Sequence, residues 1–111
     1  GTFTPDVAVS IDDTVAKKFE MLDAHVSQFY EWLPWLGGRL EDVPKDAVAR
    51  KQWLTKQRMG RISPAVRAAL VKHYGAEAGA KVQYAESFEL CEYGSRPDAA
   101  GLARLFPFVG R

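Results

Sequence analysis

The stretch that decides the fold is DDTVAKKFEMLDAHVSQFYEWLPWL, residues 12–36. Its apolar side chains recur at steps of three and four residues, at Val15, Phe19, Leu22, Val26, Phe29 and Leu33. This spacing places all six on one side of an α-helix. We therefore expect a long amphipathic helix over residues 12–33, capped by Asp12 or Asp13 and ended by the proline at position 34.

Three polar residues, Lys18, His25 and Gln28, follow the edge of this apolar stripe. At 100° per residue, Lys18 and His25 project within about 60° of Leu22. A lysine beside a buried face needs an acidic partner or a path to water, and Glu86 is the acid we nominate. A histidine in such a place is more often a satisfied structural residue than a ligand. We interpret the polar edge as a structural network.

The remaining segments predict an α+β fold that is mainly α. Short strands are expected at about residues 7–11 and 87–92, where β-branched or aromatic residues gather. Two further helices are expected at about residues 46–59 and 63–74, the second capped by Ser63, and a last short helix from Asp98 through Leu105. Residues 76–80 are expected to form a loop or a weak helical turn. Together, residues 1–111 predict a single domain or a fragment of a larger one.

Composition limits the possible functions. The chain has 111 residues, 47% of them hydrophobic, so it can bury a core. Its net charge of +1 gives no overall argument for a nucleic-acid or membrane partner. No apolar run reaches the roughly 20 residues that a membrane span needs. Cys91 is the one cysteine in the sequence, which fits a reducing compartment and predicts a cytoplasmic protein.

A basic segment, Lys45–Lys72, supports an alternative function. It contains eight Lys or Arg residues and a single acid, Asp46. The two helices predicted there resemble a helix-turn-helix in outline, and Arg58, Arg61, Arg67 and Lys72 could contact phosphates. A solvated helix face is the commoner meaning of such a run, and near-zero net charge also disfavours nucleic acid.

Catalytic and metal-binding patterns are missing from the sequence. His25 and His73 are not spaced as metal ligands on one helix, and Cys91 has no second cysteine near it. No serine lies in a nucleophile-elbow pattern. We therefore predict no catalytic residue and no metal site within this chain.

Three short motifs, in this order, resemble the C-terminal part of the PIG-L/LmbE-like zinc-dependent N-deacetylases (the GlcNAc-PI de-N-acetylase family). In that family a V-D-I-S-D-T junction leads into a K-x-x-A-L-x-A-H-x-S-Q helix, and an A-E-x-F segment follows. The matching residues here are Val9-Ser10-Ile11-Asp12-Asp13-Thr14, then Lys18, Leu22, Ala24-His25 and Ser27-Gln28, then Ala85-Glu86 with Phe88. The resemblance covers residues 6–39 and 81–92.

The resemblance implies a piece of a Rossmann-like α/β sandwich from a hydrolase that removes N-acetyl groups from amino sugars with one zinc. The family's H-P-D-D-E and H-x-D-H motifs, which supply the zinc ligands and the catalytic base, do not occur here. We therefore expect a C-terminal portion that is inactive alone and holds no zinc. Lys18, His25, Ser27, Gln28 and Glu86 would be signature residues with a structural role.

The expected partner is the N-terminal catalytic part of the same protein, which the exposed aromatics Trp32 and Trp35 would face. Without it, those aromatics would drive self-association. Gly1 in place of a methionine agrees with a start inside a longer protein. A stand-alone protein-interaction module is the main alternative from another functional class.

Overall fold

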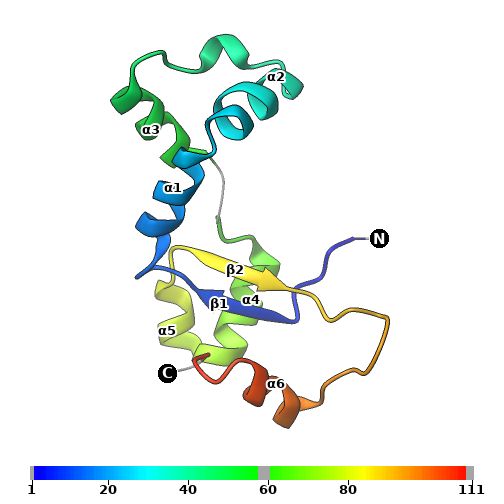
Figure 1. The fold of residues 1–111 in the computed structure, drawn as a ribbon. Helices are drawn as coiled ribbons and strands as arrows, with labels where there is room; N and C mark the ends of the chain where they lie inside the picture. The colour runs from blue at the N-terminus through cyan, green and yellow to red at the C-terminus, as the bar shows by residue number, and fades with distance from the viewer. Residues whose placement is uncertain (1, 58–60, 110–111) are drawn as a thin grey trace. The chain divides into compact units, whose positions relative to one another are not determined.

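Residues 2–57 and 61–109 are described by the computed structural model in Figure 1, in which the chain forms two units. Unit 1 consists of residues 1–12 and 60–111, and unit 2 of residues 13–59. Unit 2 is therefore inserted between two segments of unit 1. The described residues are mostly helical with one two-stranded sheet, which confirms the mainly α member of the α+β class. The Rossmann-like resemblance stays a prediction.

Unit 1 is built on an antiparallel pair of strands, β1 (Val7–Ser10) and β2 (Ala85–Phe88). Val7 is paired with Phe88 at one end and Ser10 with Ala85 at the other. Three helices complete the unit: α4 (Pro64–Tyr74), α5 (Ala76–Lys81) and α6 (Ala99–Leu105). Helix α4 packs against β1 and α5, and the core consists of Ala8, Ala69, Leu70, Val82 and Ala85.

The strand expected at residues 87–92 was displaced, because β2 lies at Ala85–Phe88. The ladder ends near Phe88, because the residue before Asp6 offers no backbone N–H group for pairing. Asp6 donates its N–H to the Phe88 carbonyl at 2.9 Å, and its carboxylate accepts the Leu90 N–H at 2.7 Å. Pro5, the next residue outward, has no N–H to give. Residues beyond Phe88 therefore bond to a side chain instead of continuing the sheet.

The helix starts in unit 1 agree with the sequence signals. The Ser63 hydroxyl accepts the Val66 N–H at the start of α4, and Asp98 accepts the Gly101 N–H at the start of α6. Residues 76–80, expected as a loop or weak turn, belong to helix α5 instead. Gly79 explains why this helix forms there. A Cβ at Gly79 would lie 2.7 Å from the Val71 Cα, so glycine allows α5 to pack directly on the α4 backbone.

Unit 2 contains α1 (Val15–Ala24), the π-helical η1 (Ser27–Trp32), α2 (Leu33–Leu36), the 3₁₀-helical η2 (Leu40–Asp42) and α3 (Ala47–Thr55). The prediction of one helix over residues 12–33 was wrong. His25, with φ −88° and ψ 63°, leaves helical geometry and separates α1 from η1. The predicted Asp12 cap was wrong too, because the Asp12 carboxylate accepts backbone N–H groups of Gln83 and Tyr84. Thr14 precedes α1 without a side-chain capping bond.

Pro34 does not end the helical path, contrary to the prediction. The path continues to Leu36, with Pro34 in the first turn of α2. The preceding turn is π-helical, since the Leu33 N–H donates to the Gln28 carbonyl five residues earlier. A proline in the first turn of a helix gives up an N–H that needs no intrahelical partner. The helical path ends at Gly37–Gly38, where Gly38 has a φ of +65°.

The helix predicted at residues 46–59 begins as expected, because Asp46 accepts the Ala49 N–H at 2.9 Å. It is shorter than predicted, with Thr55 as its last residue. The following N–H groups of Lys56 and Gln57 donate to carbonyls three residues earlier, which tightens and closes the last turn. The part of the prediction that falls on residues 58–60 lies outside the described residues. In the described part of the chain, no helix combines the length and apolarity needed to cross a membrane.

Candidate functional site

The five signature residues are distributed over both units. Lys18 is half-buried on α1, His25 is exposed at its end, and Ser27 with Gln28 is exposed on η1. Glu86 is half-buried on β2 in unit 1. The polar edge of Lys18, His25 and Gln28 was predicted on one continuous helix. This was wrong, because the helix breaks at His25, between Lys18 and Gln28. The predicted contact of the ridge with Glu86 stays a prediction.

The first and third motifs of the family resemblance meet in unit 1. Val9 of the first motif pairs with Glu86 of the third across the β1–β2 ladder. Beyond the strand ends, the Asp12 carboxylate accepts the Tyr84 N–H at 2.7 Å and the Gln83 N–H at 3.1 Å. The Ile11 N–H donates to the Tyr84 carbonyl at 2.9 Å. A charged acceptor on two successive N–H groups forms a clasp that holds the segment leading into β2.

Both ends of β1 are anchored by helix α4. The Nε2 atom of His73 lies 3.1 Å from the Asp6 carbonyl oxygen, and the Ser10 N–H donates to the Tyr74 hydroxyl at 3.2 Å. A carbonyl only accepts, so this contact requires the proton on Nε2 and leaves Nδ1 as an acceptor when the ring is neutral. His73 therefore has a specific polar partner in the Asp6 backbone.

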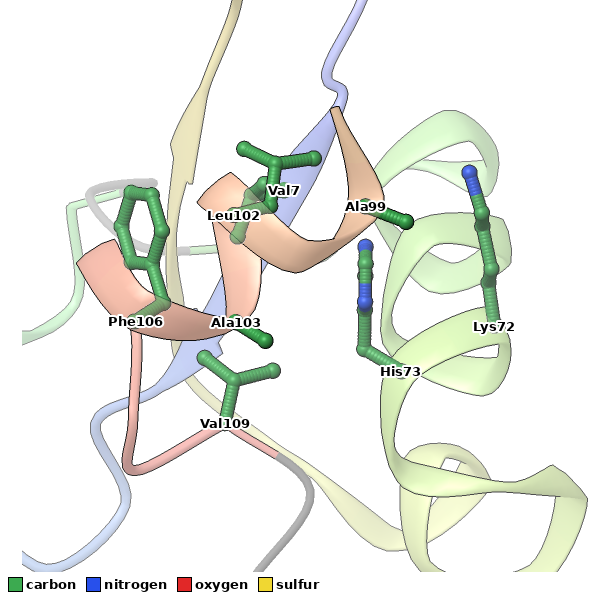
Figure 2. Close-up of a pocket in the computed structure, with 8 residues that line it drawn as sticks. All are labelled: Val7, Lys72, His73, Ala99, Leu102, Ala103, Phe106 and Val109. Carbon is green, nitrogen blue, oxygen red and sulfur yellow. The ribbon is translucent and has the colours of Figure 1, made fainter. Parts of the chain in front are cut away.

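Unit 1 contains a cleft of about 330 Å³ between β1, α4 and α6. Figure 2 shows the His73 ring beside Ala99, with Leu102, Phe106 and Val109 on the other side of the cleft. Lys72 and His73 are the polar side chains that line it, and its other lining residues are apolar. The other described lining residues carry no carboxylate, hydroxyl or thiol side chain.

A cluster of side chains around the buried Tyr30 ring connects α1, η1 and α3 in unit 2. Tyr30, which is 3% exposed, donates its hydroxyl to the Asp23 carboxylate at 2.6 Å. The Arg50 guanidinium lies 4.4 Å from the centre of the Tyr30 ring, and the Trp53 ring lies 6.3 Å from it. Burial, followed by the bond to the anionic Asp23, raises the pKa of Tyr30 to about 12. Arg50 opposes this shift, but the two raising effects exceed it, so the phenol stays neutral and structural.

The same unit carries an apolar surface around η1, α2 and η2. Trp32 is 51% exposed, and Trp35 and Leu36 are each 64% exposed. A shallow depression of about 370 Å³ is lined by Ser27, Glu31, Trp32, Trp35 and Leu40. We call these five residues the tryptophan face. Nearby, Tyr30 packs on helix α3, whereas Trp32 and Trp35 are exposed, as expected for these two tryptophans.

Metal binding finds no support in the described residues. Across residues 2–57 and 61–109, no group of three or more His, Cys, Asp or Glu side chains lies close enough to hold an ion. Cys91 is exposed and free.

Comparison with known proteins adds no assignment: no family model, no curated protein and no solved structure matches the chain.

Sequence reasoning missed the partners of Asp12 and the Tyr30 cluster. The N–H groups that Asp12 binds belong to backbone more than seventy residues away, so no side-chain pattern could have indicated them. The pair of Asp23 and Tyr30 had a detectable signal, because residues seven apart lie on the same side of a helical path. Arg50, on α3, had none.

Proposed function

We propose that this chain is the C-terminal portion of a PIG-L/LmbE-like N-deacetylase, a hydrolase that removes N-acetyl groups from amino sugars or their conjugates. Its own role is structural. Unit 1 adds a strand pair and helices to the catalytic part, and the chemistry resides in zinc-binding motifs that this chain does not contain. The chain alone is inactive in this proposal, and the full protein is cytoplasmic.

The observation that supports the proposal best is the Asp12 clasp. Asp12 belongs to the first family motif, and the backbone it binds leads directly into the third motif, Ala85-Glu86 with Phe88. Motifs separated by about seventy residues therefore meet in one small structural element. A chance match of three short motifs gives no reason for two of them to be in contact.

The size of the sheet supports a missing part. Two strands alone are marginally stable, and sheets in independent domains usually have three or more. The strands β1 and β2 form the one sheet of the described residues. A longer catalytic part that extends this sheet would supply what two strands lack.

The test uses the reading frame upstream of Gly1. We expect it to encode an H-P-D-D-E motif, and the longer polypeptide to bind one zinc and release acetate from N-acetylglucosamine conjugates. Variants with Asp-to-Ala changes within H-P-D-D-E are the matched controls. They should stay folded but release no acetate. A longer polypeptide that lacks the motif and releases no acetate would refute the proposal, as would stoichiometric zinc on the present chain by itself.

A further inference from the structure

The cleft of unit 1 has the size and the lining of a small-molecule site. Its volume of about 330 Å³ lies at the lower end of the range of about 300–1,000 Å³ that is typical of ligand pockets. One wall comes from α6 and the residues that follow it, and the facing wall comes from β1 and α4 (Figure 2). Six of the eight lining residues are apolar: Val7, Ala99, Leu102, Ala103, Phe106 and Val109. A hollow of this kind suits the apolar body of a small ligand.

The charged side chain at this cleft is a cation. Lys72 forms no ion pair within the described residues, 2–57 and 61–109. Asp6 and Asp98, the acids that precede the lining residues Val7 and Ala99, do not line the cleft themselves. Each of these two carboxylates accepts a backbone N–H at 2.7 Å. The cleft therefore has a positive local charge, which favours an anionic ligand over a cationic one.

His73 forms a fixed part of the same wall. Its Nε2 atom lies 3.1 Å from the Asp6 carbonyl oxygen, so this nitrogen is already used. Figure 2 shows the His73 ring and the Lys72 side chain extending from α4 in the same direction, toward Ala99. Because the ring is held by the backbone of β1, the Lys72 ammonium is the group left to bind an anion at this end of the cleft.

We propose that the cleft binds a small amphipathic carboxylate, with its apolar chain between α6 and β1 and its anionic head beside Lys72. The apolar lining accounts for the chain, and the Lys72 ammonium accounts for the charge of the head. A neutral ligand would leave this ammonium without a counter-ion, and a cationic head would be repelled by it. The ligand class is therefore an aliphatic or aryl-aliphatic acid.

The chain and the head of such a ligand make separable contributions. Burial of the chain supplies most of the affinity, because apolar surface is removed from water. The ion pair with an exposed lysine adds little affinity but sets the selectivity. An alcohol with the same chain enters apolar surroundings more readily than the carboxylate does, because a charged head is costly to desolvate. A preference for the carboxylate over the alcohol therefore reports a cation at the site.

The first experiment titrates the full chain with octanoate, octanol and octylamine, which share one apolar chain and differ in the head group. Backbone amide shifts in NMR spectra measure both affinity and location. We expect one saturable site, with octanoate bound about threefold to fivefold more tightly than octanol and octylamine bound most weakly. The shifted amides should be those of Lys72, His73 and residues 99–109.

Three results of this titration would overturn the proposal. One is the absence of saturable octanoate binding. Another is octylamine binding as tightly as octanoate. The third is a set of shifts at the tryptophan face of unit 2 and none at the cleft.

Two alanines of α6 provide matched variants for the location of the chain. Both are exposed, but Ala103 lines the cleft and Ala100 does not. Ala103→Leu should fill the cleft and weaken octanoate and octanol alike by at least about tenfold, whereas Ala100→Leu should leave both affinities unchanged. Circular dichroism verifies that each variant is folded. Equal octanoate affinities in the two folded variants would place the ligand elsewhere and overturn the proposal.

The charge is tested separately at Lys72. Lys72→Gln should remove the advantage of octanoate over octanol without changing the affinity for octanol. Lys51→Gln, a change of an exposed lysine on α3 in unit 2, is the control for the loss of one positive charge. A preference for octanoate that survives Lys72→Gln would contradict the assignment of the head group. Because none of these measurements involves zinc or acetate release, the inference succeeds or fails independently of the deacetylase proposal.

Discussion

Unit 1 and unit 2 solve the same packing problem with different means. Unit 1 buries a small apolar core around Leu70. Its distant segments are joined by hydrogen bonds in which the Asp6 and Asp12 carboxylates and the Tyr74 hydroxyl accept backbone N–H groups, and by the contact of His73 with the Asp6 carbonyl. Unit 2 buries the larger side chains of Phe19, Tyr30 and Leu54. It leaves Trp32, Trp35 and Leu36 exposed. The difference is that unit 1 depends on hydrogen bonds between segments distant in sequence, whereas unit 2 depends on large side chains packed between its helices.

The largest expected effect comes from the two fully buried leucines, Leu70 in unit 1 and Leu54 in unit 2. Truncation to alanine should cost about 2–5 kcal/mol in either unit, through lost burial and a cavity. All three tryptophans, Trp32, Trp35 and Trp53, lie in unit 2, so their emission reports on that unit. Leu54→Ala should shift the emission transition more than Leu70→Ala does. Equal shifts in denaturant titrations would show that the units unfold together.

A second test raises the pH to break the Tyr30 cluster in unit 2. The folded pKa of Tyr30, about 12, exceeds its ordinary value of 10. Its contribution to stability is therefore complete below pH 10 and is lost as the pH rises through 12. A shift of this size corresponds to about 2–3 kcal/mol. Tyr30→Phe should remove this part of the pH dependence, measured by denaturant unfolding with tryptophan emission. If the wild-type chain and Tyr30→Phe lose stability in the same way between pH 10 and 12, Tyr30 is not the group responsible.

A third test crowds the contact between α4 and α5 in unit 1. Gly79→Ala places a Cβ 2.7 Å from the Val71 Cα, a distance that backbone atoms must shift to relieve. We expect a loss of about 1–3 kcal/mol, typical of overpacking. Ala78→Gly, an exposed change on the same helix, is the control for helix propensity and should cost less. Thermal unfolding followed by circular dichroism measures both, and a neutral Gly79→Ala would show that the helices are not in close contact.

The smallest expected effect concerns the Asp12 clasp. Asp12→Asn keeps the shape but weakens an ionic acceptor of two N–H groups, and because the site is exposed we expect a loss of about 1 kcal/mol. Asp13→Asn is the matched control, since Asp13 is its exposed neighbour and accepts no hydrogen bond in the described structure. Hydrogen exchange at the Gln83 and Tyr84 amides should accelerate in the first variant alone. Unchanged exchange at both amides would show that the Asp12 carboxylate does not protect them.

Local signals predicted much of the fold. Ser63, Asp46 and Asp98 each cap a helix where the sequence indicated one, because a cap needs only a side-chain oxygen and the next turn of the backbone. The strand at residues 7–11 was correct within one residue, since alternation with a period of two is a local property. The mainly helical class followed from these elements.

Two local predictions were wrong where distant residues determine the structure. The second strand was displaced because Asp6 and Pro5, far away in the chain, determine where the ladder ends. Residues 76–80 gave no strong helical signal, yet contact with α4 makes them a helix.

The long stretch at residues 12–36 separates the two kinds of information. The sequence by itself determined that this stretch is helical and amphipathic, because a period of three to four apolar residues is compatible with no other regular structure. Only the tertiary structure decided that it breaks at His25, continues as a π turn, and begins after Asp12 rather than with it. Periodicity depends on neighbours within one turn. The Asp12 carboxylate, in contrast, binds the N–H groups of Gln83 and Tyr84 instead of capping the helix, and only folding brings those groups near.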